Sequence, residues 1–310
     1  GEHFLWEKIN EEVFRKVAHK CYKPANRMLA DMVEQNPNFK IAISTTGVML
    51  EQALQWDPEV IDTIDDLLRV GKKRNQVEML AETYYHSVSS LFHDPELNEF
   101  EEQVEMHGKL IKELFGVTPR CFRNTEHFTN NRILDKIQSM GYHLTLCEYR
   151  PDMDENQNVP KDHPNRGVRT HYAFKSGKGL ITLPRDRWKS DGPGYRFGNA
   201  GEYITADNFA QGIANIAGQA VGIFIDGEHI GEHKWPDTGI FNFYWCFNLC
   251  RVFFADNAGD LTDRPKIKRR SVRSDRVVQL RLNHDSIGLR RGENAQGSYL
   301  RIAQGHAGFP

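Results

Sequence analysis

Short runs of apolar residues alternate along the chain with longer segments in which apolar residues recur every three or four positions. The short runs are typical of strands that are buried on both faces, and the longer spacing is typical of amphipathic helices. Six runs are predicted to form strands: residues 39–45, 77–82, 119–126, 142–147, 180–183 and 221–225. Helical patterns separate most of these runs, which favours a largely parallel sheet with right-handed crossovers.

The helical segments lead to an α/β architecture. They are predicted at residues 11–35, 48–56, 57–70, 94–116, 130–140 and 205–217. The chain opens on a helix, which is unusual for a βα repeat, and we therefore expect that its first strand is missing. Such a sheet would leave two strand edges without partners. A barrel of seven or eight βα units is the preferred architecture, and an open doubly wound sheet is the alternative.

The regular pattern stops after residue 243. We therefore predict an incomplete catalytic barrel over residues 1–243 and a basic, atypical segment over 244–310, expected to be disordered. That segment has 12 Lys and Arg against 6 Asp and Glu, whereas the rest has 28 against 36. The acidic body argues against a nucleic-acid enzyme. A binding module whose basic stretch, residues 264–276, contacts an acidic partner is a separate hypothesis.

Cysteine content and hydropathy indicate the compartment. The five cysteines are few, scattered and odd in number, which indicates a reduced, cytoplasmic protein. Cys246 and Cys250 have no second Cys or His pair at zinc-finger spacing, so a structural metal is not expected. No apolar run approaches 18 residues, so no membrane span is predicted.

Two carboxylates follow predicted strands, and they are the leading candidates for chemistry. Glu126 ends one strand and Asp226 follows another. In a parallel barrel both would project from the same end, and two opposed carboxylates are what glycosidic cleavage requires. Aromatic and imidazole groups suited to sugar binding lie near them: Tyr84, Tyr85, His86, Phe128 and Trp235. The simpler interpretation is that Asp226 caps the next segment and that the aromatic residues belong to the core.

A zinc motif overlaps the second acid. His229 and His233 fit the pattern H-x-x-E-H, in which both imidazoles bind zinc from one helical face. Gly231 lies inside the motif and Pro236 follows it, so a stable helix here is doubtful. A metal-dependent hydrolase, such as a carbohydrate deacetylase with these histidines and a carboxylate as ligands, is the alternative from another class of enzyme.

Four separated segments, in the same order, resemble the motifs of glycoside hydrolase family 57, in its α-amylase-like branch. They are ISTTGVMLEQAL at 43–54, AETYYHSVSSLF at 81–92, CFRNTEHFTNN at 121–131 and FIDGEHIGEHKWPDTGIF at 224–241. The resemblance extends over about residues 4–243. It departs from the family in lacking the first, His-Gln-Pro motif. Gly227 and His229 also stand where the family usually has Tyr and Thr.

The resemblance implies a (β/α)7 barrel that acts on α-1,4-glucans or maltooligosaccharides with retention of configuration, by double displacement and without a metal or organic cofactor. By motif position, Glu126 would be the nucleophile and Asp226 the general acid/base. His86 and Arg123 would line the donor subsite. A 4-α-glucanotransferase or a glucan branching enzyme on the same site is the alternative within the family.

Overall fold

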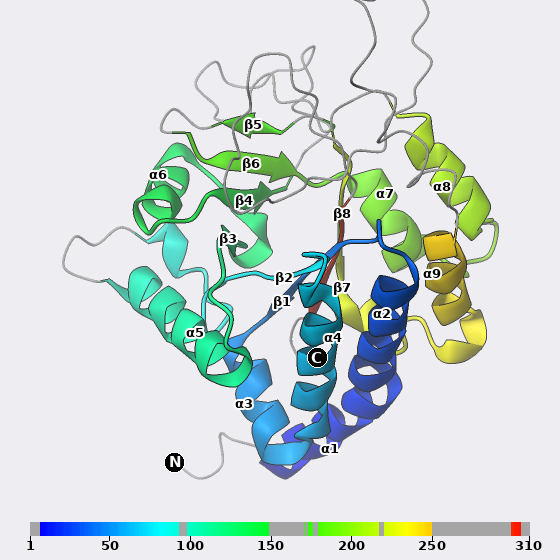
Figure 1. The fold of residues 1–310 in the computed structure, drawn as a ribbon, viewed down its shortest axis with the longest axis horizontal. Coiled ribbons are helices and arrows are strands. Elements are labelled where there is room, and N and C mark those ends of the chain that lie inside the picture. Colours follow the sequence, from blue (N-terminus) through cyan, green and yellow to red (C-terminus); the bar gives the residue numbers. More distant parts are fainter. Residues whose placement is uncertain are drawn as a thin grey trace, which may run out of the picture.

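The computed structural model describes residues 7–92, 98–148, 171, 173–175, 179–216, 220–249 and 299–304. The strands lie in the middle of the molecule, and the helices surround them on the outside (Figure 1). The described helices are α1 Glu7–Val17, α2 Lys23–Gln35, α3 Gly47–Trp56, α4 Glu59–Lys72, α5 Glu99–Phe115, α6 Asn131–Ser139, α7 Arg187–Asp191, α8 Ala206–Ala214 and α9 Ile240–Leu249. The described strands are β1 Ile41–Thr45, β2 Val77–Met79, β3 Cys121–Phe122, β4 Leu144–Cys147, β5 Phe174–Lys175, β6 Ile181–Pro184, β7 Gly222–Asp226 and β8 Tyr299–Gln304.

All six predicted strands occur, as β1, β2, β3, β4, β6 and β7. The prediction that Glu126 ends a strand is wrong, because β3 ends at Phe122 and Glu126 lies in the 3-10 turn Thr125–His127. The predicted helices are confirmed as well, although the predicted start of α5 at residue 94 lies outside the described residues. The predicted helical segment 11–35 consists of α1 and α2, and Pro24 lies at the start of α2. It stands in the first turn of α2, where it needs no hydrogen-bonded amide, and a π-helical turn at Ala18–Tyr22 joins α1 to α2.

The strands form two hydrogen-bonded groups. One has the order β2-β1-β8-β7 and is parallel throughout, and the other has the order β3-β4-β6-β5, in which only β5 is antiparallel. Single parallel bridges, Ala81 with Phe122 and Arg185 with Gly222, join the two groups at both borders. The carboxyl ends of the parallel strands therefore lie at one end of the molecule.

The prediction of two unpaired strand edges is wrong for this structure. The edges in question belong to β1 and β7, the first and the last of the six predicted strands. Residues 299–304 fill the space between them as β8, which pairs in parallel with both neighbours. The pattern after residue 243 contains no strand signal comparable to the earlier runs, and β8 was therefore not predicted.

The strands are apolar on both faces because each face packs against a different layer. Ile41 and Ile43 of β1 point toward the helices and belong to the large core cluster, whereas Ala42 belongs to a smaller cluster between the strands. That inner cluster also contains residues that belong to the other strands or lie within two residues of them: Leu80, Cys121, Leu144, Leu146, Ile181, Leu183, Ala220 and Phe224. This double burial explains the uninterrupted apolar runs in the sequence.

Helix α9 crosses the predicted domain boundary at residue 243. Its residues Phe243 and Phe247 pack on Phe209 of α8, so the outer core continues past that point. Residues 250–298 and 305–310 lie outside the described part, and the disorder expected there stays a prediction. Within the described part, no helix combines the length and the apolar character that crossing a membrane requires.

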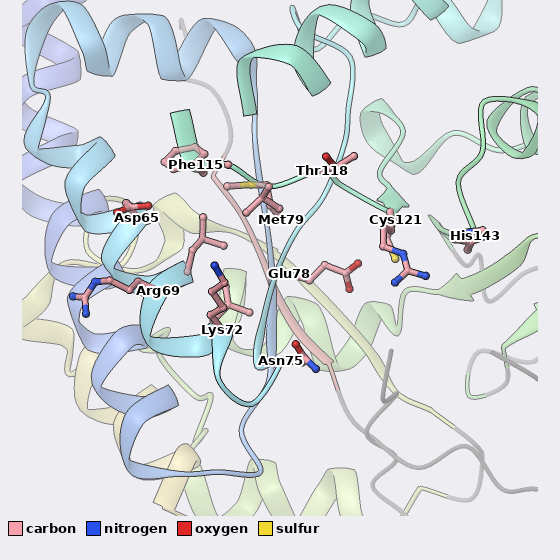
Figure 2. Close-up of a pocket in the computed structure, with 15 residues that line it drawn as sticks. Asp65, Arg69, Lys72, Asn75, Glu78, Met79, Phe115, Thr118, Cys121 and His143 are labelled. Carbon is pink, nitrogen blue, oxygen red and sulfur yellow. The ribbon is translucent and has the colours of Figure 1, made fainter. Parts of the chain in front are cut away.

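A cavity of about 420 Å³ lies near the amino ends of β2 and β3. Figure 2 shows Glu78 in its middle, with Lys72 and Arg69 on the side of α4 and Cys121 on the side of β3. Val77 and Cys121, which line the cavity, are the first residues of their strands. The cavity therefore lies at the end of the strands opposite Glu126 and Asp226.

Candidate active site

The turns that follow β2 and β3 contain strained backbone. Glu126, His127 and His86 have φ angles of 52°, 56° and 55°. These are left-handed values that cost roughly 1–3 kcal/mol for residues with a side chain. Among the described residues other than glycine, Asn75 is the only other one with a positive φ. Strain of this kind clusters at functional sites, because surrounding contacts must hold it in place.

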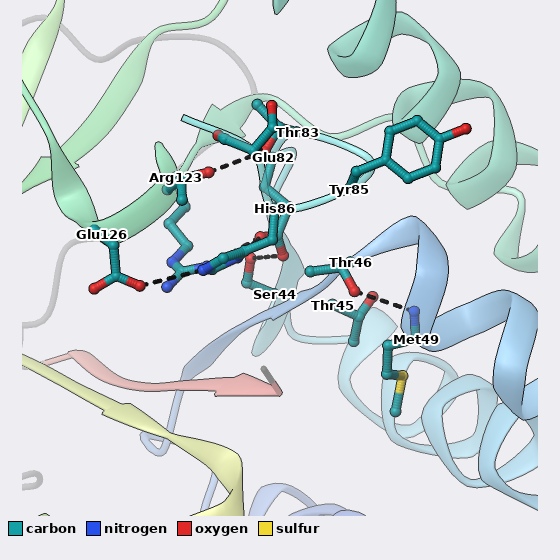
Figure 3. A network of polar contacts seen from close by, with 12 residues as sticks. Ser44, Thr45, Thr46, Met49, Glu82, Thr83, Tyr85, His86, Arg123 and Glu126 are labelled. Atoms are coloured by element: carbon teal, nitrogen blue, oxygen red, sulfur yellow. Dashed lines mark hydrogen bonds and ion pairs between the residues drawn. The ribbon is translucent and has the colours of Figure 1, made fainter. Parts of the chain in front are cut away.

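Glu126 is exposed but not isolated. Its side chain is 66% exposed, and Nε2 of His86 lies 3.2 Å from Oε1 (Figure 3). Arg123 donates from Nη1 to Nδ1 of His86 at 3.3 Å. Burial lowers the pKa of His86, but the carboxylates of Glu126 and Glu82 outweigh burial and raise it above its usual value. Neutral or charged, the ring can present an N–H group to Glu126.

A buried carboxylate lies behind this pair. Glu82 is fully buried, and it accepts hydrogen bonds from Ser44 Oγ at 2.6 Å and from Arg123 Nη1 at 3.0 Å (Figure 3). Burial raises its pKa, yet Arg123, His86, His107 and Ser44 together lower that pKa to about 2. Glu82 therefore stays ionised and holds Arg123 and His86 in place beneath Glu126.

Asp226 is the last residue of β7, and its side chain is half exposed. The next three residues, Gly227–His229, form one 3-10 turn. Cys21 Sγ donates to the carbonyl of Gly227 at 3.2 Å, and the hydroxyl of Tyr22 donates to Glu228 Oε1 at 2.9 Å. The π-helical turn before α2 thus fixes the segment that presents Asp226.

Both acids lie at the carboxyl ends of the strands, on the same side of the molecule. The ring of His127, next to Glu126, lies 5.3 Å from the ring of Phe224 in β7. The pKa of Tyr195 is affected by both acids. Burial raises this pKa most, and the negative charges of Asp226, Asp191 and Glu126 raise it further, whereas the positive charge of Arg185 lowers it. The structure therefore brings the two predicted catalytic residues to one region from positions 100 apart in sequence.

Tyr84 is buried away from this region. Its hydroxyl donates to Glu51 Oε1 of α3 at 2.7 Å, and its ring lies where a Cβ atom on Gly47 would have to be. Tyr85 is half exposed, and Figure 3 shows it pointing away from Glu126. Tyr84 therefore packs α3 against the turn after β2, and its contact with a substrate stays a prediction.

Phe128 and Trp235 are exposed enough to contact a ligand. Phe128 is 40% exposed, and its carbonyl accepts a hydrogen bond from Asn124 Nδ2 at 2.8 Å. Trp235 is 58% exposed, and the amine of Lys20 lies over one face of its ring, 4.9 Å from the centroid. Their roles as sugar-binding residues are untested predictions.

Two charged residues at this end of the strands, Arg185 and Glu148, were not predicted as site residues. Arg185 follows β6, and it donates to the carbonyl of Phe224 at 3.0 Å and to Asp191 at 2.7 Å. Glu148 follows β4, lies 3.4 Å from Arg185, and has a raised pKa because it is partly buried. The sequence contained a signal for both, since Glu148 directly follows the predicted strand 142–147 and Arg185 stands two residues after the predicted strand 180–183.

The zinc motif does not form the helix that it needs. Residues 229–235 form turns rather than an α-helix, and the rings of His229 and His233 lie 5.1 Å apart, centroid to centroid. Nowhere in the described ranges do three or more His, Cys, Asp or Glu side chains form a group that could hold a metal ion. This arrangement does not favour a metal-dependent deacetylase.

Comparison with known proteins points to the other hypothesis. A protein of Methanocaldococcus jannaschii named "Putative alpha-amylase" is 38% identical over 247 residues. The match covers 77% of this chain and 49% of that protein, so the chain spans about half the length of this relative.

Two solved structures share the fold. A 4-alpha-glucanotransferase from Thermococcus litoralis aligns with 79% of this chain and 35% of its own, at a TM-score of 0.57 and 17% identity. A family 57 branching enzyme from Thermococcus kodakaraensis aligns with 86% of this chain and 69% of its own, at a TM-score of 0.54 and 12% identity. The sequence model of glycosyl hydrolase family 57 matches residues 1–258. The chain therefore belongs to glycosyl hydrolase family 57.

Proposed function

We propose that this protein is a retaining glycoside hydrolase that acts on α-1,4-glucans. The single observation that carries the proposal is the placement of Glu126 in the turn after β3 and of Asp226 at the end of β7, where both negative charges raise the pKa of Tyr195. Glu126 attacks the anomeric carbon, and Asp226 gives a proton to the leaving oxygen and later takes one from water. The relative named as an alpha-amylase supports this choice of substrate.

The residues around Glu126 fit a donor subsite. His86 and Arg123 lie beside it on a base formed by Glu82, and both can donate hydrogen bonds to sugar hydroxyls. Because Glu82 balances the charge of Arg123, the nucleophile has a polar environment without a full neighbouring cation.

A closed (β/α)7 barrel is the architecture that we infer, formed by residues 1–243 together with β8. The support is the pair of parallel bridges that join the two strand groups at both borders. Backbone hydrogen bonds reinforce each seam: Arg123 N to Ala81 O at 2.7 Å, and Asp186 N to Gly222 O at 2.6 Å. In this arrangement β8 takes a place in the barrel between β1 and β7.

The choice between hydrolysis and transfer depends on the acceptor. The aligned structures include a glucanotransferase and a branching enzyme, so transfer to a second glucan is the alternative for the same site. Sizing the products formed from maltooligosaccharides distinguishes the two, because a transferase yields chains longer than the substrate. We also infer a reducing, cytoplasmic setting, supported by the free thiols of Cys21 and Cys147.

Two substitutions test the roles of the acids. Glu126→Gln should lower kcat by about 10³-fold or more on every substrate, because no glycosyl-enzyme can form. Asp226→Asn should retain the first step on aryl glycosides whose leaving group needs no proton. Added azide should then restore turnover of Asp226→Asn and yield the glycosyl azide.

The control is the same pair of variants on maltooligosaccharides, where both should be inactive. Equal losses in both variants on activated substrates, with no effect of azide, would contradict the assignment of roles. Inversion of configuration in the product, measured by NMR, would contradict double displacement.

A further inference from the structure

His229 is one of the two residues at which the segment after Asp226 departs from the family pattern, and its surroundings indicate a function toward that acid. The residue is only 4% exposed, and its Nε2 atom lies 4.0 Å from Asp226 Oδ2. This distance is longer than that of a hydrogen bond. Because the Asp226 side chain is half exposed, a small rotation of the carboxyl group would close the gap.

Neighbouring groups hold the imidazole in place. Tyr195 lies edge-on against it, with ring centroids 4.7 Å apart and planes at 73°, and His233 lies 5.1 Å away on centroids. Gly194 packs so closely that a Cβ atom there would stand 3.4 Å from Cδ2 of His229. The ring therefore cannot turn freely, and the carboxyl group of Asp226 is the partner that adjusts.

The imidazole is neutral at physiological pH. Burial lowers the pKa of His229 to about 4, with His233, Lys234 and Arg185 acting in the same direction and Asp226 opposing them. Its Nδ1 atom is buried and has no hydrogen-bond partner among the described residues. A proton on Nδ1 would be a buried N–H group without an acceptor, so the favoured neutral tautomer has its proton on Nε2. In that tautomer the single N–H group points toward Asp226.

A neutral donor suits an acid that must both give and take a proton. An imidazolium would hold Asp226 as an anion and weaken it as an acid, whereas a neutral N–H group aligns the carboxyl with less effect on its charge. We propose that His229, held by Tyr195, is a positioning residue that aligns Asp226 with the glycosidic oxygen. This inference rests on the proposed function, in which Asp226 is the general acid/base.

The pairing is tested without any substrate. Histidine NMR titration of the wild-type protein and of Asp226→Asn, with the signal assigned from His229→Gln, should show His229 titrating well below pH 6.5. It should titrate at still lower pH in Asp226→Asn, because the charge of Asp226 stabilises the imidazolium. An unchanged titration overturns the pairing, whether or not the enzyme is active on glucans.

Kinetic measurements test whether His229 aligns Asp226 for proton transfer. His229→Leu removes the donor, whereas His229→Gln keeps an N–H group near the position of Nε2. For His229→Leu we expect kcat/KM on maltooligosaccharides to fall about 10- to 100-fold, but less than about threefold on aryl glycosides with good leaving groups. The basic limb of its pH–rate profile should move to higher pH, because the Asp226 anion has lost a donor, and His229→Gln should stay close to wild type.

Equal losses on both substrates, with unshifted pH profiles, overturn the positioning function and leave His229 a packing residue. A wild-type protein inactive on every glucan overturns the proposed function instead, and the NMR titration still decides the pairing.

Discussion

At the scale of single residues, the site depends on a carboxylate that never reaches solvent. Glu82 compensates the buried guanidinium of Arg123, and both lie beneath the exposed Glu126. Removing one partner of a buried ion pair leaves the other charge buried and unpaired. Glu82 therefore contributes both to stability and to the geometry of the donor subsite.

Glu82→Gln should lower the free energy of unfolding at pH 7 by about 3 kcal/mol, because Arg123 loses its counter-charge. Urea unfolding followed by circular dichroism measures the change. Activity should also fall, since Arg123 and His86 lose their shared support. A variant as stable as wild type would show that Arg123 finds another partner.

The pH dependence of stability has a definite sign. The pKa of Glu82 is about 2 in the folded protein, against about 4.3 in an unfolded chain, and this difference corresponds to roughly 3 kcal/mol. Since the folded pKa is lowered, the contribution is present above pH 5 and is lost as the pH falls toward 2. In Glu82→Gln the stability should therefore fall less steeply between pH 5 and pH 2.

Glu78 is the matched control on the same segment. Its pKa is raised, because burial outweighs a hydrogen bond from Cys121 and the charges of Arg120 and Lys40. The folded state thus binds the proton of Glu78 more tightly than the unfolded chain does. The contribution of protonated Glu78 to the free energy of unfolding is therefore lost as the pH rises. Glu78→Gln should leave the stability at pH 7 unchanged or raise it, opposite to Glu82→Gln.

At the scale of elements, two π-helical turns support the segment that carries Asp226. Ala18–Tyr22 bonds to it through Cys21 and Tyr22, and Gly192–Arg196 packs Tyr195 on His229. Turns of this type are rare and occur frequently at functional sites. Their packing on Gly227–His229 explains how a short, Gly-containing turn can hold a general acid.

The seam between β6 and β7 requires a glycine. A Cβ atom on Gly222 would lie 2.2 Å from the carbonyl oxygen of Pro184, so the two strands could not approach each other. Gly222→Ala should destabilise the protein by at least about 2 kcal/mol, measured by urea unfolding.

Gly108→Ala is the control for that substitution. Gly108 lies inside α5, and a Cβ atom there would meet nothing within 4 Å. It should stabilise the protein by about 0.5–1 kcal/mol, because alanine loses less backbone entropy in a helix. Similar effects of the two substitutions would show that the strands do not meet at Gly222.

At the scale of the whole molecule, β8 joins the first and the last of the predicted strands. Deleting residues 299–310 should expose the edges of β1 and β7, lower Tm and promote aggregation. Hydrogen exchange should accelerate most in β7, whose other neighbour, β6, contacts it through a single bridge.

A chain that ends after Gln304 retains β8 and is the control for the deletion. Its Tm and its exchange rates should match those of the full chain. If both truncated chains behave alike, β8 does not contribute to the stability of the sheet.

Local residue patterns were sufficient to predict the six strands and the acids that follow or end them. A strand buried on two faces needs consecutive apolar residues, and the polar residue that ends it, such as Asp226, is visible in the same pattern. Tertiary contacts bring β8 between β1 and β7, keep Glu82 ionised beside Arg123, and hold His229 against Tyr195. These outcomes depend on burial and on partners far apart in the chain, and no local pattern of residues encodes either.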